Sequence, residues 1–188
     1  MKDIVKTAII LSLIAIVAGV LLGAVNGLTY MTDEEKLNRN LNSAYESKDG
    51  YEAVDLTKYK APEGSVAKLK SCYKAKGATD EVYIYSTNVK GYKKNLELMI
   101  VVKNNKIINI VKTASGETIA KPLSAENFSK YYDIDLTKTK GFHTNKQTAD
   151  KDKTGVTVIS GATLSSNGIC NSIDLVVAYH NQIVGGKA

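Results

Sequence analysis

The chain has 188 residues, and its 25 Lys and Arg exceed its 19 Asp and Glu to give a formal net charge of +6. The lysines are spread over every segment after Met31, which indicates a solvated basic surface and argues against a nucleic-acid-binding protein, whose charge clusters on one face. This length provides for one membrane segment and one domain of ordinary size, and it excludes a second large domain.

An uncharged, apolar segment at residues 7–31 follows a short tail at residues 1–6. A helix of about 20 apolar residues crosses a hydrocarbon core of roughly 30 Å, so the sequence predicts a transmembrane helix. The alternative is a cleaved signal peptide, whose apolar region is usually shorter, about 7–15 residues. Lys2 and Lys6 precede the helix, and the positive-inside tendency then predicts a cytoplasmic N-terminus, a single pass through the cell membrane, and an extracytoplasmic domain at residues 32–188.

Three glycines repeat at every fourth position of this segment: Gly19, Gly23 and Gly27. Such a ridge of small residues lets another transmembrane helix approach closely, and it predicts a subunit of a larger membrane assembly. The alternative is the ordinary tolerance of glycine in membrane helices.

The middle of the exported domain is predicted to be a meander of antiparallel strands. One hairpin is expected around a turn at residues 77–80. The clearer hairpin has apolar strands at residues 96–102 and 107–111, joined by Asn104 and Asn105, which tolerate the left-handed backbone of a tight turn.

Short helices are predicted on both sides of this meander. Thr32 or Asp33 is expected to cap an amphipathic helix that follows the membrane segment. A second short helix is expected after Pro122, with Ser124 or Glu126 near its start.

The last third of the chain is predicted to end in a packed helix. The run at residues 143–155 is too hydrophilic for a core and indicates a surface loop, and a short β-branched strand is expected at residues 156–159. The final helix places four apolar residues on one face, Ile169, Ile173, Val176 and Val177. These elements predict the α+β class, with an antiparallel sheet.

Residues 51–58 (YEAVDLTK) and 131–138 (YYDIDLTK) share five of eight residues, which an internal duplication, a shared turn type or chance would each explain. Cys72 and Cys170 form no CxxC pair, so they are expected either in a structural disulfide or as two buried thiols. No catalytic residue is predicted. No metal site is predicted either, because neither histidine has a carboxylate or cysteine at ligand spacing.

The run Val-Ile-Ser-Gly-Ala-Thr-Leu-Ser-Ser-Asn-Gly at residues 158–168 places several small hydroxyl side chains at the start of the final helix. Unpaired N–H groups and the helix dipole at such an end attract phosphate. Gly161 allows the backbone to turn close to a ligand, and Thr163 presents a hydroxyl. The alternative is that Ser160 or Thr163 merely caps the helix.

Ser160, Gly161, Ala162 and Thr163, followed by Leu164 and Ser165, resemble the flavinylation motif of the FMN-binding domain family. That family includes the G subunit of the Rnf complex and the C subunit of the sodium-translocating NADH:quinone reductase. Its members carry FMN on the last threonine of the motif through a phosphoester that a flavin transferase makes. The resemblance therefore implies covalent FMN on Thr163, and the chain length favours the Rnf subunit.

Three further residues are assigned to the FMN site by the same resemblance. Glu117 and Thr118 match part of a segment that lies near the flavin in the family, and Tyr92 follows Gly91 as in a family Gly-Tyr pair. Thr157 stands where the family usually has an Asp, three residues before the serine of the motif.

The resemblance implies an electron-transfer subunit of an Rnf-type ferredoxin:NAD oxidoreductase that translocates sodium ions or protons. Its partners are then other membrane subunits of the complex, the lipid bilayer, and the flavin transferase during maturation. Two alternatives remain at this point. One is a pilus-like or scaffold membrane protein without cofactor, and the other is a free-standing FMN-binding sensor or reductase module.

Overall fold

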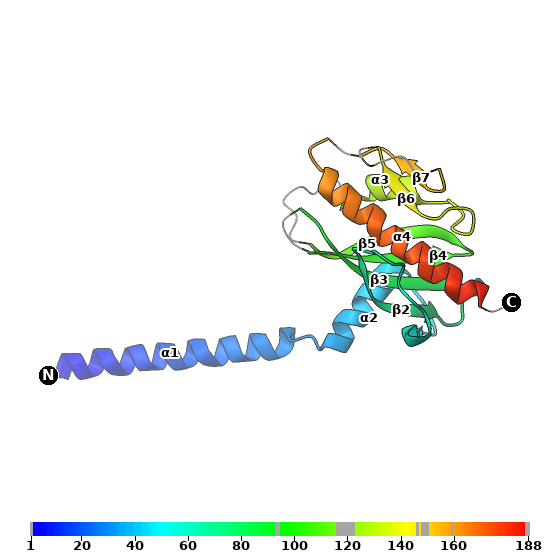
Figure 1. The fold of residues 1–188 in the computed structure, drawn as a ribbon. Coiled ribbons are helices and arrows are strands. Elements are labelled where there is room, and N and C mark those ends of the chain that lie inside the picture. The colour runs from blue at the N-terminus through cyan, green and yellow to red at the C-terminus, as the bar shows by residue number, and fades with distance from the viewer. Residues whose placement is uncertain are drawn as a thin grey trace. The chain divides into compact units, whose positions relative to one another are not determined.

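The computed structural model describes residues 2–92, 95–115, 123–145, 147, 151–158 and 160–186 (Figure 1). The chain divides into two compact units, Met1–Arg39 and Asn40–Ala188. The first unit contains α1 (Lys2–Thr29), and no residue of its apolar part is packed inside the protein. The stretch Ile4–Thr29 has a mean hydropathy of 2.9, so its length and composition suit a membrane anchor or a signal sequence.

The start of α2 (Asp33–Ala44) is fixed by a capping box, and of the two predicted caps, Thr32 and Asp33, it is Thr32 that caps the helix. The backbone N–H of Glu35 donates to Oγ1 of Thr32 over 3.2 Å, and the backbone N–H of Thr32 donates to Oε2 of Glu35 over 2.8 Å. These bonds to the charged carboxylate lower the pKa of Glu35. In the second unit, Leu41 and Ala44 of α2 are buried.

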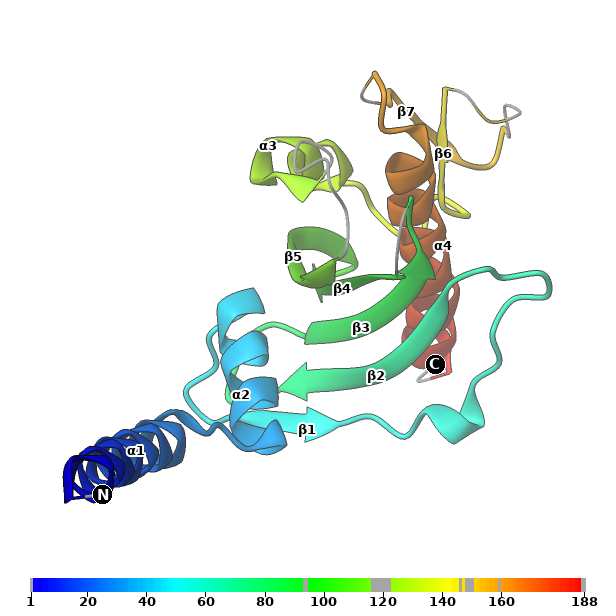
Figure 2. The ribbon, with the colours of Figure 1, turned by 90° about the vertical axis from the view of Figure 1, so that its left-hand side faces the viewer.

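The second unit is built on a five-stranded antiparallel sheet in the order β1-β2-β3-β4-β5 (Figure 2). Its strands are β1 (Tyr51–Ala53), β2 (Lys68–Ala75), β3 (Val82–Lys90), β4 (Asn95–Lys103) and β5 (Lys106–Ser115). Both predicted hairpins are confirmed. Asn104 and Asn105 join β4 to β5 with φ values of 49° and 63°, the left-handed backbone that this turn requires.

The core lies between one face of this sheet and α4 (Thr163–Gly185), which packs against β2, β3 and β4. Alternate residues of the central strands point toward α4, and all of them are buried: Tyr83, Tyr85, Leu96, Leu98, Ile100 and Val102. The four residues predicted for the buried face of the final helix are also buried there. The fold is therefore an apolar N-terminal helix followed by an α+β domain, as expected.

A short helix, α3 (Ala125–Phe128), follows Ser124 and continues into a 3-10 turn, η3 (Ser129–Tyr131). Its predicted start is confirmed, although the side chain of Ser124 makes no capping hydrogen bond. Phe128 and Tyr131 pack into the same core as α4.

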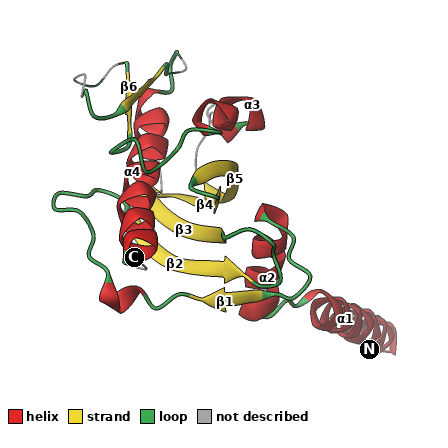
Figure 3. Cartoon of the chain, turned by 90° about the vertical axis from the view of Figure 1, so that its right-hand side faces the viewer, coloured by secondary structure: helices red, strands yellow, loops and turns green. Residues whose placement is uncertain are grey.

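The prediction of a surface loop at residues 143–155 is wrong at both ends. β6 (Phe142–Thr144) and β7 (Thr154–Val156) form a separate parallel pair, and β6 lies beside the N-terminal half of α4 (Figure 3). The pair forms because Phe142 and Thr144 are buried although their neighbours in the sequence are polar. The strand expected at residues 156–159 starts and ends earlier, and only Val156 belongs to it.

The two similar octapeptides contain the same turn. In each, the Asp side chain accepts from the backbone N–H and from the hydroxyl of the Thr two residues on. The distances are 3.0 and 2.6 Å for Asp55 and Thr57, against 3.0 and 2.7 Å for Asp135 and Thr137. The shared turn type accounts for the likeness, since Asp-Leu-Thr-Lys favours this local side-chain-to-backbone bonding.

Candidate functional site

The motif that resembles a flavinylation site forms the turn into α4. The helix begins at Thr163, and Ala162 occupies the N-cap position with φ −127° and ψ 31°. The first helical bond runs from the backbone N–H of Ser166 to the carbonyl of Ala162, over 3.0 Å. Neither Ser160 nor Thr163 stands at the cap, so the interpretation of these hydroxyls as helix caps is wrong. The cap depends on which residue leaves the helical backbone conformation, and here that residue has no side-chain oxygen.

The turn leaves the threonine hydroxyl at an open helix end. Gly161 has φ 79°, a left-handed conformation that side chains with a Cβ rarely adopt. Ser160 and Gly161 are exposed and Thr163 is half-buried, whereas Ala162 is buried. N–H groups in the first turn of a helix have no carbonyl partner within the helix, and the dipole there favours an anion. The first turn of α4, which begins at Thr163, is therefore suited to an anion.

The other two hydroxyls of the motif face the interior. Ser165 and Ser166 are 2% and 6% exposed, in the first turn of α4. Leu164, between them and Thr163, is instead 55% exposed. The helix thus separates an accessible side, with Thr163 and Leu164, from a buried side with the two serines.

The end of β3 lies against the second turn of α4. A Cβ atom built on Gly168 would lie 3.3 Å from the carbonyl oxygen of Lys90 and 3.5 Å from Cγ1 of Val89. This close approach brings the chain that leads to Tyr92 toward the start of α4. Tyr92 is 59% exposed.

Tyr92 and Leu164 are unusual in their exposure. In the described residues from 40 onward, the only exposed large hydrophobic side chains are those two and Val66. Two of the three were assigned to the FMN site by sequence: Tyr92 follows β3, and Leu164 lies in the first turn of α4, the two elements that meet at Gly168. Exposed apolar surface beside an open helix end suits the flat ring and the phosphate of a flavin nucleotide. Glu117 and Thr118, also assigned to the site, lie outside the described residues.

Two residues that the sequence analysis assigned to a loop contact both sides of the turn. Thr144 Oγ1 donates to Oδ1 of Asn167 in α4 over 2.7 Å, and Asn145 Oδ1 accepts from the backbone N–H of Val158 over 3.1 Å. Their polar character was visible in the sequence, but it does not distinguish them from solvated neighbours.

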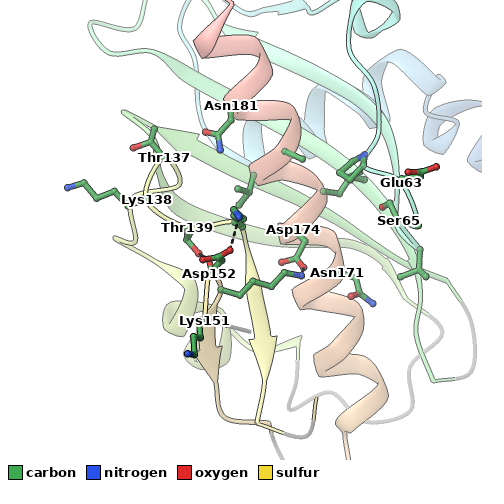
Figure 4. A pocket seen from close by; sticks show the side chains of 18 residues that line it. Glu63, Ser65, Thr137, Lys138, Thr139, Lys151, Asp152, Asn171, Asp174 and Asn181 are labelled. Atoms are coloured by element: carbon green, nitrogen blue, oxygen red, sulfur yellow. Dashed lines mark hydrogen bonds and ion pairs between the residues drawn. The ribbon is translucent and has the colours of Figure 1, made fainter. Parts of the chain in front are cut away.

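A pocket of about 890 Å³ lies farther along α4 (Figure 4). Asn171, Asp174 and Asn181 of the helix line it, together with residues 62–66, 137–140 and 151–153. Four of the lining residues form two ion pairs, Lys140 with Asp152 and Lys153 with Asp174, each over 2.6 Å. No residue of the run 160–166 lines this pocket, so it is separate from the turn at Thr163.

The histidines have structural contacts. His180 is buried, with its Nδ1 2.8 Å from Tyr85 Oη and its Nε2 3.0 Å from Asn105 Oδ1. His143 Nδ1 lies 3.3 Å from the carbonyl of Thr144. In the part of the chain that the structure describes, no group of three or more His, Cys, Asp or Glu side chains could hold a metal ion.

Both cysteines are free and buried. Burial raises the pKa of Cys72 to about 12 and that of Cys170 to about 11. The expectation of two buried thiols is therefore confirmed, and the alternative of a structural disulfide is wrong. Their high pKa values keep them protonated and unreactive at neutral pH.

Comparison with known proteins finds a family model that covers the turn. No curated protein matches the chain. The model of the FMN-binding domain family matches residues 91–178, a segment that begins directly after β3 and contains both Tyr92 and the whole run 160–166. This match supports the FMN-binding family for the part of the domain that carries the Thr163 turn.

Proposed function

We propose that this protein is a membrane-anchored flavoprotein that carries FMN on Thr163 through a phosphoester and relays electrons within an Rnf-type membrane complex. The observation that carries the proposal is the position of Thr163. It is a half-buried threonine in the first turn of a helix, after a left-handed glycine, within a segment that matches the FMN-binding domain family.

The residues around the turn suit each part of FMN. The open first turn of α4 favours the remaining negative charge of the phosphate diester. The exposed side chains of Tyr92 and Leu164 offer apolar surface for the ring. FMN supplies one- and two-electron transfer when it is bound, and the protein then contributes orientation and electrostatics.

Attachment would transfer the FMN phosphoryl group from a donor to the hydroxyl of Thr163. Oγ1 of Thr163 forms a bond to the phosphorus of the FMN half of a flavin dinucleotide donor, the phosphoanhydride bond of the donor breaks, and the nucleoside monophosphate leaves. The hydroxyl proton passes to a base of the flavin transferase. A dinucleotide donor is required because condensation with free FMN would have to release water in an aqueous environment.

Support for the anchor and the partners comes from α1. Its apolar stretch Ile4–Thr29 is long enough to cross a bilayer, which would keep the domain at the membrane surface beside other subunits. Gly19, Gly23 and Gly27 carry no side chains along one line of the helix, which would let another helix approach closely in the bilayer. The chain itself contributes the electron carrier, and coupling to sodium ion or proton movement belongs to the complex.

Mass spectrometry of the protein from its native membranes tests the attachment. We expect the peptide that contains Thr163 to be heavier by FMN less one water, and Thr163→Val to abolish both this adduct and the yellow colour. Thr57→Val is the matched control, since it makes the same substitution at an exposed threonine outside the motif and should leave the adduct. An unmodified native peptide would falsify the proposal of covalent FMN.

The role in a complex is tested separately. An affinity tag on the C-terminus, followed by purification in mild detergent, should recover other membrane subunits together with the flavinylated chain. Recovery of the loaded chain alone would instead indicate a free-standing flavoprotein.

A further inference from the structure

We propose that Thr144 and Asn145 are positioning residues that hold the Thr163 turn in the conformation that the flavin transferase modifies. This inference rests on the proposed function. Together the two residues are termed the Thr144–Asn145 bracket, because one contacts the chain before the turn and the other contacts the helix after it.

Asn145 holds the chain that enters the turn. Its backbone N–H donates to the carbonyl of Val156 over 3.0 Å, which extends the β6–β7 pairing by one bond. Its side-chain Oδ1 accepts from the backbone N–H of Val158 over 3.1 Å. The side chain thus supplies the carbonyl that a longer strand would have supplied, so the chain remains fixed after β7 has ended at Val156.

Thr144 holds the helix that leaves the turn. Its Oγ1 donates to Oδ1 of Asn167 over 2.7 Å, one helical turn after Thr163. Thr144 is 1% exposed, so water does not readily replace this bond. Because Thr144 and Asn145 are adjacent, any change in the distance between the two sides of the turn strains one of these contacts.

The bracket is itself fixed to α4. The backbone N–H of Phe142 donates to Oδ1 of Asp174 over 2.6 Å, and the backbone N–H of Thr144 donates to Oε1 of Gln147 over 2.7 Å. Lys153 pairs with the second oxygen of Asp174, and burial of Phe142 in the core holds β6 in place. The turn at residues 160–163 is therefore spanned by a support that is anchored independently of it.

This support matters for the transfer because the hydroxyl must meet a phosphorus atom held by a second protein. A turn that samples many conformations presents Oγ1 in the reactive geometry only part of the time, and displacements of about 1 Å can slow a reaction by about 100-fold. Loss of the bracket should therefore slow flavinylation in a domain that stays folded.

The test measures the initial rate of flavinylation of the full-length protein in detergent, with purified flavin transferase and flavin adenine dinucleotide. For Asn145→Ala we expect a decrease on the order of tenfold or more, because the acceptor for Val158 is lost. Asn145→Asp keeps an oxygen at the same place and should retain most of the rate. Thr144→Val and Thr144→Ser form a second pair with the same expected contrast, should Asn145→Ala fail to fold.

Two further measurements distinguish positioning from a structural role. Asn181→Ala is the matched control, because Asn181 lies far along α4 and the substitution removes one hydrogen bond, from its Nδ2 to the Leu136 carbonyl. Its rate of flavinylation should match that of the wild type. Hydrogen exchange of residues 157–166 should accelerate in Asn145→Ala while the unfolding temperature of the domain stays close to that of Asn181→Ala.

Flavinylation of Asn145→Ala at the wild-type rate would overturn the positioning role of the bracket. A lower rate that is fully explained by a smaller fraction of folded protein would overturn it as well. Failure of the wild-type chain to accept flavin at all would instead contradict the proposed function.

Discussion

Oη of Tyr85 on β3 lies 2.8 Å from Nδ1 of His180 on α4, and both side chains are buried. Since Nε2 of His180 faces the acceptor Oδ1 of Asn105 over 3.0 Å, the ring proton belongs on Nε2, and Tyr85 donates to Nδ1. Burial raises the pKa of Tyr85 well above its usual value, so the phenol keeps its proton as the donor.

Tyr85→Phe should therefore destabilise the domain by about 1–3 kcal/mol, because the buried Nδ1 of His180 loses the hydrogen bond from Tyr85. Urea unfolding followed by circular dichroism measures this change. Tyr92→Phe is the matched control at an exposed site and should change the free energy of unfolding by no more than about 0.5 kcal/mol. Equal stability of the two variants would contradict the role assigned to the buried bond.

The buried thiols should not react in the folded protein. With pKa values of about 12 for Cys72 and about 11 for Cys170, almost no thiolate is present at pH 8, and the side chains are not accessible. A maleimide reagent should label neither cysteine in buffer and both in denaturant. Lys151→Cys places a thiol on the surface and should react at once. Rapid labelling of the native wild type would show that the core opens readily.

The two Asp-Leu-Thr-Lys turns should titrate alike. Hydrogen bonds from Thr57 and Thr137 lower the pKa of Asp55 and Asp135 below the ordinary value of 3.8. A lowered folded-state pKa gives stability that is present above 3.8 and is lost as the pH falls through the folded-state value. Carboxyl NMR titration should show both groups below 3.8, and Thr137→Val should return Asp135 toward that value while Asp55 is unchanged. An unshifted Asp135 in the wild type would contradict the turn geometry.

Thr157→Asp should increase the rate of flavinylation. The family usually has an Asp at this place, and Thr157 is exposed, so a carboxylate can be introduced there without burial of charge. Thr157→Asn is the control of similar size without the charge. The rate with transferase and flavin dinucleotide is compared for the three proteins. An unchanged rate in Thr157→Asp would mean that the transferase reads the turn itself and not this side chain.

The mature protein should retain α1. A membrane anchor stays in the chain, whereas a signal sequence is removed, so the intact mass of the protein from native membranes separates the two. We expect a mass that includes residues 7–31 and extraction by detergent but not by high salt. Deletion of residues 1–31 should release the domain into the soluble fraction. A mature N-terminus after residue 31 would contradict the anchor.

The parts of the fold that local sequence determines could be predicted. Asn104 and Asn105 identify their hairpin because few other residues adopt a left-handed backbone, and the spacing of Ile169, Ile173, Val176 and Val177 identifies the buried face of α4. The β6–β7 pair could not be predicted, since each strand has three residues and its partner is chosen by burial of Phe142 beside α4.

The candidate site divides in the same way. Thr163 and Gly161 belong to a contiguous motif, so resemblance was sufficient to propose them as site residues. Capping by Ser160 or Thr163 was a reasonable expectation from composition, but the backbone conformation of Ala162 makes that residue the N-cap at the start of α4. Asn145 and Thr144 act across the fold on Val158 and Asn167, and a polar run that also contains solvated residues gives no sign of such contacts.

Asn105 takes part in the tight turn between β4 and β5 and also in the bond to His180, 75 residues later in the chain. A chain that emerges from the ribosome N-terminus first completes this hairpin before α4 has been made. The sheet then presents an apolar surface, including Leu98 and Ile100, that nothing yet covers. Productive folding of the domain therefore depends on α4, which is synthesised after the whole sheet, and truncation before α4 should yield a chain that aggregates or recruits chaperones.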